Sequence, residues 1–144
     1  MKRMPRVKEV MTAFPFSIAE SATMAQAKAM MKEHRVGHLP VKFADGTLGV
    51  LSKSELQRTE LPGHTHTDFD ELNVADLCPS ECYIVDLQTS LIEVLDYMSE
   101  THSDCVLVTR HDKLAGVFTA SDACHAYSEA LKDEFFPGGG DSVA

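Results

Sequence analysis

A glycine, a threonine and an aspartate stand at one predicted junction between a strand and a helix, in the segment Gly116-Val117-Phe118-Thr119-Ala120-Ser121-Asp122. Glycine allows a ligand to approach the backbone closely, and the start of a helix offers unpaired N–H groups and a partial positive charge to a phosphate. The carboxylate of Asp122, three residues after Thr119, could accept hydrogen bonds from both hydroxyls of a ribose. The junction is therefore a candidate nucleotide site.

The same spacing also describes a helix cap. In Thr119-x-x-Asp122, and in an earlier Ser52-x-x-Glu55, the hydroxyl can accept a hydrogen bond from the first helical turn while the carboxylate accepts one in return. Such a cap stabilises a helix by about 1 kcal/mol whether or not a ligand is present. Both interpretations stay open, and the longer side chain of Glu55 favours capping at the earlier junction.

Metal and redox chemistry form an alternative, because the chain contains several histidines and cysteines. The relevant residues are His64, His66, Asp68 and Asp70 in one segment, and Cys78, Cys82, Cys105 and Cys124 in the second half. No Cys-x-x-Cys pair is present, so the spacing does not predict a zinc site. In a reducing compartment the cysteines are expected to remain thiols.

Signatures of catalysis are missing. The sequence has no nucleophile elbow, no phosphate-binding loop followed by lysine, and no dinucleotide fingerprint. The run Gly138-Gly139-Gly140 has no lysine after it and is interpreted as part of a flexible tail, residues 137–144. We therefore expect no catalytic residues, no enzyme activity and no required cofactor.

Charge and hydropathy argue against further classes of function. The 144 residues include 22 acidic and 13 basic side chains, for a net charge of −9, and no segment carries a long basic run. Nucleic acid is thus not an expected partner. No stretch of 18 apolar residues occurs, so membrane insertion is not expected. The first residues lack the apolar run of a signal peptide, which predicts a cytoplasmic protein.

An internal repeat organises the chain. Val7–Leu56 aligns without a gap on Val74–Ala123, a shift of 67 positions from Val7 to Val74. Identical pairs include Met31 with Met98 and Gly49 with Gly116, and both copies carry a capping pattern, Thr23-x-x-Gln26 and Ser90-x-x-Glu93. The alignment predicts repeats at 1–60 and 74–136, the second including a C-terminal helix, joined by a polar linker at 61–73.

Each repeat has the same expected order of elements. A short helical turn leads to an extended segment, a helix, a hairpin of two apolar runs and a last helix. The helix after Ser90 has Leu91, Val94, Leu95 and Met98 on one face. The fold class is therefore α/β (α+β), with two β-α-β-β-α repeats expected to pack sheet to sheet with pseudo-two-fold symmetry, since one repeat alone has too small a core.

The ordered pattern resembles the cystathionine-β-synthase (CBS) domain, and two copies in tandem resemble a Bateman module. The likeness is carried by Val7-Lys8-Glu9-Val10-Met11-Thr12, His38-Leu39-Pro40-Val41, Asp45-Gly46 and Gly49-Val50-Leu51-Ser52 with Glu55. The second copy departs from this pattern, with Cys78-Pro79 in place of Met11-Thr12 and no proline in Val106-Leu107-Val108. The resemblance covers roughly Val7 to Tyr127.

The resemblance implies a regulatory module that binds AMP, ADP, ATP or S-adenosylmethionine in clefts between the repeats. Thr119 and Asp122 match the family's ribose and phosphate contacts, with Gly116 before them, and Ser52 and Glu55 are the equivalents in the first copy. The positions matched to adenine are Cys82, Tyr83, Ile84, Cys105 and Val106, with Phe16 and His38 in the first copy. Taken singly, the apolar residues in this set are more often ordinary core than ligand contacts.

The combined prediction is a stand-alone module that senses an adenosine-containing ligand and signals to an effector protein whose identity the sequence does not give. The resemblance further implies a homodimer. The main alternative is a ligand-free structural or dimerisation module, and a metal- or redox-responsive protein is the second alternative.

Overall fold

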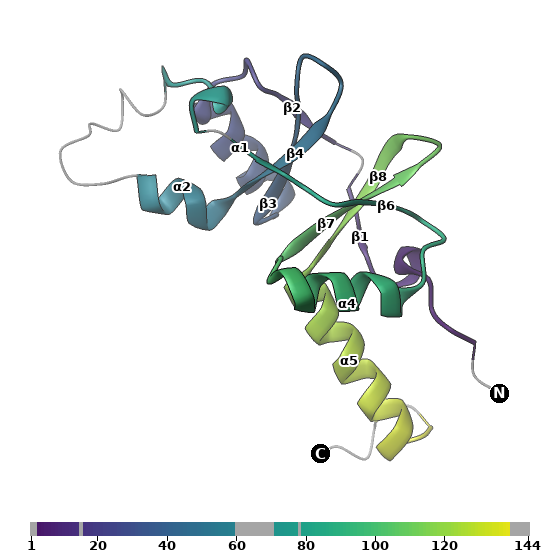
Figure 1. The fold of residues 1–144 in the computed structure, drawn as a ribbon. Coiled ribbons are helices and arrows are strands. Elements are labelled where there is room, and N and C mark those ends of the chain that lie inside the picture. Colours follow the sequence, from purple (N-terminus) through teal and green to yellow (C-terminus); the bar gives the residue numbers. More distant parts are fainter. Residues whose placement is uncertain (1–2, 15, 60–70, 78, 139–144) are drawn as a thin grey trace. The chain divides into compact units, whose positions relative to one another are not determined.

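The protein is described here from a computed structural model, which covers residues 3–14, 16–59, 71–77 and 79–138. The chain forms two compact units. One consists of residues 16–83, and the other joins residues 1–15 to residues 84–144. Each unit has one four-stranded sheet, and Figure 1 shows the helices beside the sheets.

The unit of residues 16–83 has a sheet with strand order β2-β3-β4-β5, in which β2 is parallel to β3 and the other pairs are antiparallel. Helices α1 and α2 belong to it. Its elements are β2 (Ile18–Ala19), α1 (Met24–His34), β3 (His38–Lys42), β4 (Leu48–Ser52), α2 (Lys53–Thr59), the 3-10 helix η2 (Val74–Leu77) and β5 (Ser80–Glu81).

The other unit repeats this plan, with strand order β1-β8-β7-β6 and helices α4 and α5. Again the strand before the first helix is parallel to its neighbour and the remaining pairs are antiparallel. Its elements are η1 (Val7–Glu9), β1 (Thr12–Ala13), β6 (Ile84–Asp86), α4 (Leu91–Thr101), β7 (Cys105–Arg110), β8 (Lys113–Thr119) and α5 (Ala120–Phe135).

The predicted repeat is confirmed in the element starts. Met24 and Leu91 begin the first helices, His38 and Cys105 begin the following strands, and Lys53 and Ala120 begin the last helices, each pair 67 positions apart. Even the helix ends agree, because the residue after each first helix is left-handed: Arg35 has φ 55° and His102 has φ 56°. The α/β class and the β-α-β-β-α order are therefore confirmed.

The two repeats exchange their leading segments. Strand β1 lies in the leading segment of the first repeat (the first lead, which ends at Ala13) but pairs with β8 of the second, with Thr12 opposite Val117. Strand β5 lies in the leading segment of the second repeat (the second lead, which ends at Glu81) and pairs with β4 of the first. Each lead thus covers the open edge of the other repeat's hairpin, where unpaired backbone groups would otherwise lie. The compact units consequently cross the repeat boundaries read from the sequence.

Backbone bonds at the bases of the two leads are equivalent. The Val7 N–H donates to Thr89 O over 2.9 Å, and the Val74 N–H donates to Ala22 O over 2.8 Å. Each lead also supplies a carbonyl to the start of a helix, Leu72 O to the Met24 N–H and Pro5 O to the Leu91 N–H. The exchange is therefore a reciprocal feature of both repeats.

The two predicted capping boxes at the first helices differ. Thr23 and Gln26 form the reciprocal pair, with the Gln26 N–H bonded to Thr23 Oγ1 at 3.2 Å and the Thr23 N–H bonded to Gln26 Oε1 at 2.9 Å. Ser90 makes no side-chain cap bond to α4. That prediction was wrong, although the Leu91 N–H at this terminus has its bond to the Pro5 carbonyl.

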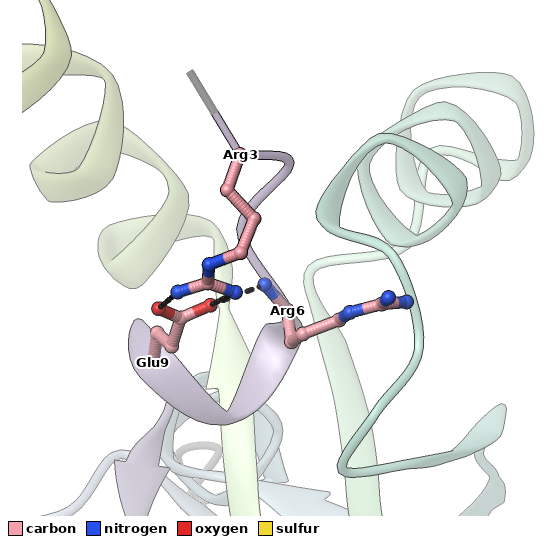
Figure 2. A network of polar contacts seen from close by, with 3 residues as sticks. All are labelled: Arg3, Arg6 and Glu9. Atoms are coloured by element: carbon pink, nitrogen blue, oxygen red, sulfur yellow. Dashed lines mark hydrogen bonds and ion pairs between the residues drawn. The ribbon is translucent and has the colours of Figure 1, made fainter. Parts of the chain in front are cut away.

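The carboxylate of Glu9 links residues within the first lead by hydrogen bonds (Figure 2). Glu9 accepts hydrogen bonds from the Arg3 guanidinium at 2.6 and 3.3 Å and from the Arg6 N–H at 2.6 Å. The hydrogen bond from Arg3, followed by that from the Arg6 backbone, lowers the pKa of Glu9. The interaction with Glu9 in turn raises the pKa of Arg3. Asp76 repeats this backbone role in the second lead, accepting from the Asn73 N–H at 2.9 Å.

The core of the β1-β8-β7-β6 unit lies between its sheet and α4. Predicted helix residues Leu91, Val94 and Met98 are buried, and Leu95 packs partly against the same cluster. The rest of the cluster comes from the lead and the strands: Val7, Val85, Val106, Val108 and Phe118. Within the described residues, no helix has the length and apolar character that crossing a membrane requires.

Candidate functional site

The junction between β8 and α5 has the geometry of a helix cap. The Asp122 N–H donates to Thr119 Oγ1 at 3.3 Å, and Asp122 Oδ2 accepts from the Thr119 N–H at 2.9 Å and from its hydroxyl at 3.1 Å. Both residues are half-buried. The capping interpretation of Thr119-x-x-Asp122 is therefore confirmed as a structural role, and it engages one oxygen of the carboxylate.

The other oxygen of this carboxylate bonds to the exchanged lead. Asp122 Oδ1 accepts from the hydroxyl of Thr12, on β1, at 3.0 Å. An alkyl hydroxyl thus already donates to Asp122 in the way that a ribose hydroxyl would. Sequence reasoning missed Thr12 as a site residue because it lies 110 positions away from Asp122. A carboxylate oxygen has two lone pairs, so Oδ1 can still accept a second donor.

Gly116 allows a close approach, and the group that approaches is the protein's own lead. A Cβ atom at residue 116 would lie 2.6 Å from Thr12 O and 2.8 Å from Met11 Sδ. Ala13 is directly opposite Gly116 in the β1–β8 pair. The absence of a side chain at Gly116 is therefore required by β1, independently of any ligand.

The predicted adenine contacts in this unit lie on neighbouring strands. Cys105 is opposite Thr119 in the β7–β8 pair, so its backbone is adjacent to the helix cap. Val106 is fully buried in the core cluster, which leaves only its backbone for a ligand. Ile84 on β6 pairs with Leu107 and is 42% exposed. The structure thus gathers Thr12, Gly116, Thr119, Asp122 and Cys105 in one unit.

The remaining predicted residues belong to the unit of residues 16–83. His38 is opposite Ser52 in the β3–β4 pair, and Ser52 Oγ accepts from the Glu55 N–H at 3.1 Å. Phe16 stacks on His34, with ring centroids 4.9 Å apart. Cys82 and Tyr83 follow β5, and Tyr83 is 36% exposed. The residue equivalent to Thr12 is Pro79, which has no hydroxyl to donate to Glu55.

The unit of residues 16–83 has a larger and a smaller cavity, and neither is lined by a predicted ligand residue, although Gly37, Lys53 and Leu56 of the larger one are next to His38, Ser52 and Glu55 in sequence. The larger, of about 740 Å³, lies between α1 and α2 and is lined by four basic residues, Lys28, Lys32, Arg35 and Lys53, and by Met31 and Leu56 among its apolar residues. The smaller, of about 480 Å³, involves Ser17, Glu20 and Lys42. Sequence analysis did not single out the basic residues, although Lys28, Lys32 and Arg35 share one helix face by their spacing.

The metal alternative finds no site among the residues that the structure describes, since no group of three His, Cys, Asp or Glu side chains could hold an ion there. His64, His66, Asp68, Asp70 and Cys78 lie outside the described residues. So do most of the predicted linker, residues 61–73, and residues 139–144 of the predicted tail. The described cysteines, Cys82, Cys105 and Cys124, form no disulfide with one another.

Comparison with known proteins finds a match to each of the two repeats. The sequence profile of the family described as CBS domain matches residues 7–60 and again residues 74–129. "Hypoxic response protein 1" of Mycobacterium tuberculosis is 28% identical over 120 residues, which cover 83% of this chain and 82% of that protein.

Two solved structures extend the comparison. A putative acetoin utilization protein (AcuB) from Vibrio cholerae has a TM-score of 0.72 and 25% identity, covering 92% of this chain and 96% of that one. The crystal structure of Hypoxic Response Protein I with two coordinated zinc ions has a TM-score of 0.66 and 26% identity, covering 84% and 98%. Sequence profile and structural likeness therefore agree on both halves of the chain.

Proposed function

Because this chain belongs to the CBS-domain family, we propose that it is a stand-alone regulatory module, not an enzyme, which binds an adenosine-containing ligand between its repeats and signals to an effector protein. The ligand classes are AMP, ADP, ATP and S-adenosylmethionine. The proposal includes a cytoplasmic location, where all four cysteines of the sequence would remain thiols.

The observation that carries this proposal is the bond between Asp122 and Thr12. Asp122 stands in the first turn of α5, where helix N–H groups favour an anionic ligand, and its Oδ1 already receives an alkyl hydroxyl. In our proposal a ribose hydroxyl joins or replaces the Thr12 hydroxyl at this oxygen. In our proposal, the adenine ring stacks on the exposed apolar surface of Ile84, which belongs to the same unit as Asp122.

This geometry also suggests how binding is transmitted. Replacing the Thr12 bond would weaken the hold of α5 on β1, and β1 leads along the chain into the other compact unit. A ligand that binds the β1-released state better shifts the population toward that state. The effector protein would then recognise the altered surface.

A ligand-free dimerisation module is the second candidate, and three observations favour it. Both oxygens of Asp122 have protein partners, and the face of Gly116 is covered by β1. In addition, α5 has no buried residue within the chain and exposes Tyr127 at 67% and Phe135 at 66%. A second copy of the chain would cover this apolar surface.

Thermal unfolding with added ligand separates the two candidates. We expect one of AMP, ADP, ATP or S-adenosylmethionine to stabilise the full chain, by about 2.7 kcal/mol at a hundredfold excess over its dissociation constant. Asp122→Asn keeps the size of the side chain but makes it a weaker acceptor of hydrogen bonds from a ribose. This variant should lose the stabilisation by the ligand. The matched variant Thr12→Val removes the competing hydroxyl and leaves the carboxylate, so its ligand shift should equal or exceed that of the wild type.

The control for the junction is Glu55→Gln, which alters the corresponding carboxylate in the first repeat and should keep the shift. A melting temperature that none of the four ligands raises would support the dimerisation module. A shift that survives Asp122→Asn would place the ligand elsewhere.

A further inference from the structure

The cavity between α1 and α2, which we call the basic cavity, concentrates positive charge in an acidic chain. Four of the 13 basic residues of the sequence line it, namely Lys28, Lys32, Arg35 and Lys53, and no carboxylate of the described residues does. Met31 and Leu56, both nearly fully buried, contribute apolar surface to the same lining. A volume of about 740 Å³ is within the range of roughly 300–1,000 Å³ that small-molecule sites occupy.

Three of these cations have no partner among the residues that the structure describes. Across the described residues, no hydrogen bond or ion pair engages the side-chain nitrogens of Lys32, Arg35 or Lys53, and all three residues are exposed. Nearby carbonyl groups are already used by the backbone: Met31 O accepts from the Val36 N–H at 3.1 Å, and Gly37 O accepts from the Lys53 N–H at 2.8 Å. Among the described residues, these three cations therefore line the cavity without a paired anion.

The fold does not require this charge. At the equivalent positions the second repeat has Leu95 for Lys28, Ser99 for Lys32, His102 for Arg35 and Ala120 for Lys53. Its helix α4 has the same length and the same left-handed end without a basic residue in its last turn. Cations near a helix C-terminus are favourable in general, but α4 forms without them. The basic cavity is thus a specialisation of the first repeat.

We propose that the basic cavity binds an amphipathic organic anion, a small molecule with an apolar body and a carboxylate, phosphate or sulfonate head group. Arg35 offers two parallel N–H donors to such a head group, and the lysines contribute point charges. The apolar lining receives the body of the ligand. This site lies within one compact unit and shares no residue with the proposed nucleotide site. It therefore goes beyond the proposed function, and its test does not depend on whether a nucleotide binds.

A small ligand fits the charges better than an extended polyanion. Outside the basic cavity, the nine remaining basic residues are opposed by 22 acidic ones. A membrane surface or a nucleic acid would meet this acidic remainder and be repelled by it. A small anion meets only the cavity.

The test uses the fluorescent arylsulfonate 8-anilinonaphthalene-1-sulfonate, titrated into the full chain, with the uncharged N-phenyl-1-naphthylamine as the neutral probe. The variant Lys32→Ser with Arg35→His introduces the residues that the second repeat has at these positions, so α1 should still form. The matched control, Arg110→His with Lys113→Ser, makes the same change of charge at the exposed β7–β8 turn.

We expect the cavity variant to bind the sulfonate about tenfold or more weakly, the control to stay within about twofold of the wild type, and the neutral probe to bind all three proteins equally. Wild-type binding of the sulfonate should weaken with added salt, because exposed charges are screened. Equal sulfonate affinity in the wild type and the cavity variant would overturn the proposal. So would co-sedimentation of the wild type, but not of the cavity variant, with phosphatidylglycerol vesicles, since the cavity would then serve a membrane surface.

Discussion

Replacing Gly116 by alanine tests the pairing of β1 with β8 at the position where the two strands approach most closely. The new Cβ would lie 2.6 Å from the carbonyl oxygen of Thr12, well inside the normal contact distance. Met11 Sδ, at 2.8 Å, is on a flexible side chain and can move, but the Thr12 carbonyl is backbone held in the β1–β8 pair. The substitution therefore has to displace β1.

The size of the effect follows from what β1 would lose. Its contacts include the pairing of Thr12 with Val117, the bond from the Phe14 N–H to Ala115 O at 3.2 Å, and the Thr12 bond to Asp122. At roughly 1 kcal/mol for each hydrogen bond, full detachment costs about 3 kcal/mol. A strained but attached β1 costs at least about 1 kcal/mol. We expect the free energy of unfolding to fall by about 1–3 kcal/mol.

Urea unfolding followed by circular dichroism measures this change, and hydrogen exchange of the Thr12 and Ala13 amides locates it. Gly37→Ala is the control, because a Cβ atom there would meet no atom within 4 Å and the residue has no positive φ. It should be neutral or slightly stabilising, since alanine restricts the unfolded chain. A Gly116→Ala protein with wild-type stability and unchanged exchange at Thr12 would refute the assignment of β1 to the second sheet.

Two further predictions concern the first lead and α5. Because Arg3 lowers the pKa of Glu9, the folded state binds the Glu9 proton less tightly than the unfolded state; its stabilising contribution is present above the ordinary pKa of about 4.3 and is lost as the pH falls through the lowered value. An NMR titration should show this low pKa and its rise in Arg3→Ala, and an unaltered Glu9 titration in that variant would contradict the ion pair. For α5, we expect light scattering to give a dimer of the 15.8 kDa chain that Tyr127→Glu dissociates and the α4 control Ile92→Glu, at a 50% exposed residue, leaves intact. A monomeric wild type, or a dimeric Tyr127→Glu protein, would exclude α5 as the interface.

The two repeats differ at their candidate binding positions. Thr119 and Asp122 stand at the junction between β8 and α5, and Ser52 and Glu55 stand at the equivalent junction between β4 and α2. The hydroxyl of Thr12 bonds to Asp122, whereas Pro79 at the equivalent position has no hydroxyl for Glu55. The four basic residues of the basic cavity likewise have no lysine or arginine at the equivalent positions of the second repeat. In our two proposals, these differences between the copies mark the binding positions.

Much of the fold could be predicted from sequence because its signals are local. The cap at Thr23 and the apolar face of Leu91, Val94 and Met98 each depend on neighbours within a few helical turns. Such patterns determine where an element starts and which face is buried. The starts of α1, α4, β3 and β7 accordingly agree with the repeat alignment.

Only the tertiary structure decided which strand completes each sheet and what surrounds the candidate residues. The lead of the first repeat could have paired with either hairpin, and its pairing with β8 brings Thr12 to Asp122 across 110 positions and closes the space beside Gly116. Lys53 joins the α1 cations because β4 turns directly into α2. These outcomes depend on contacts between distant segments, which local patterns of charge and hydrophobicity do not specify.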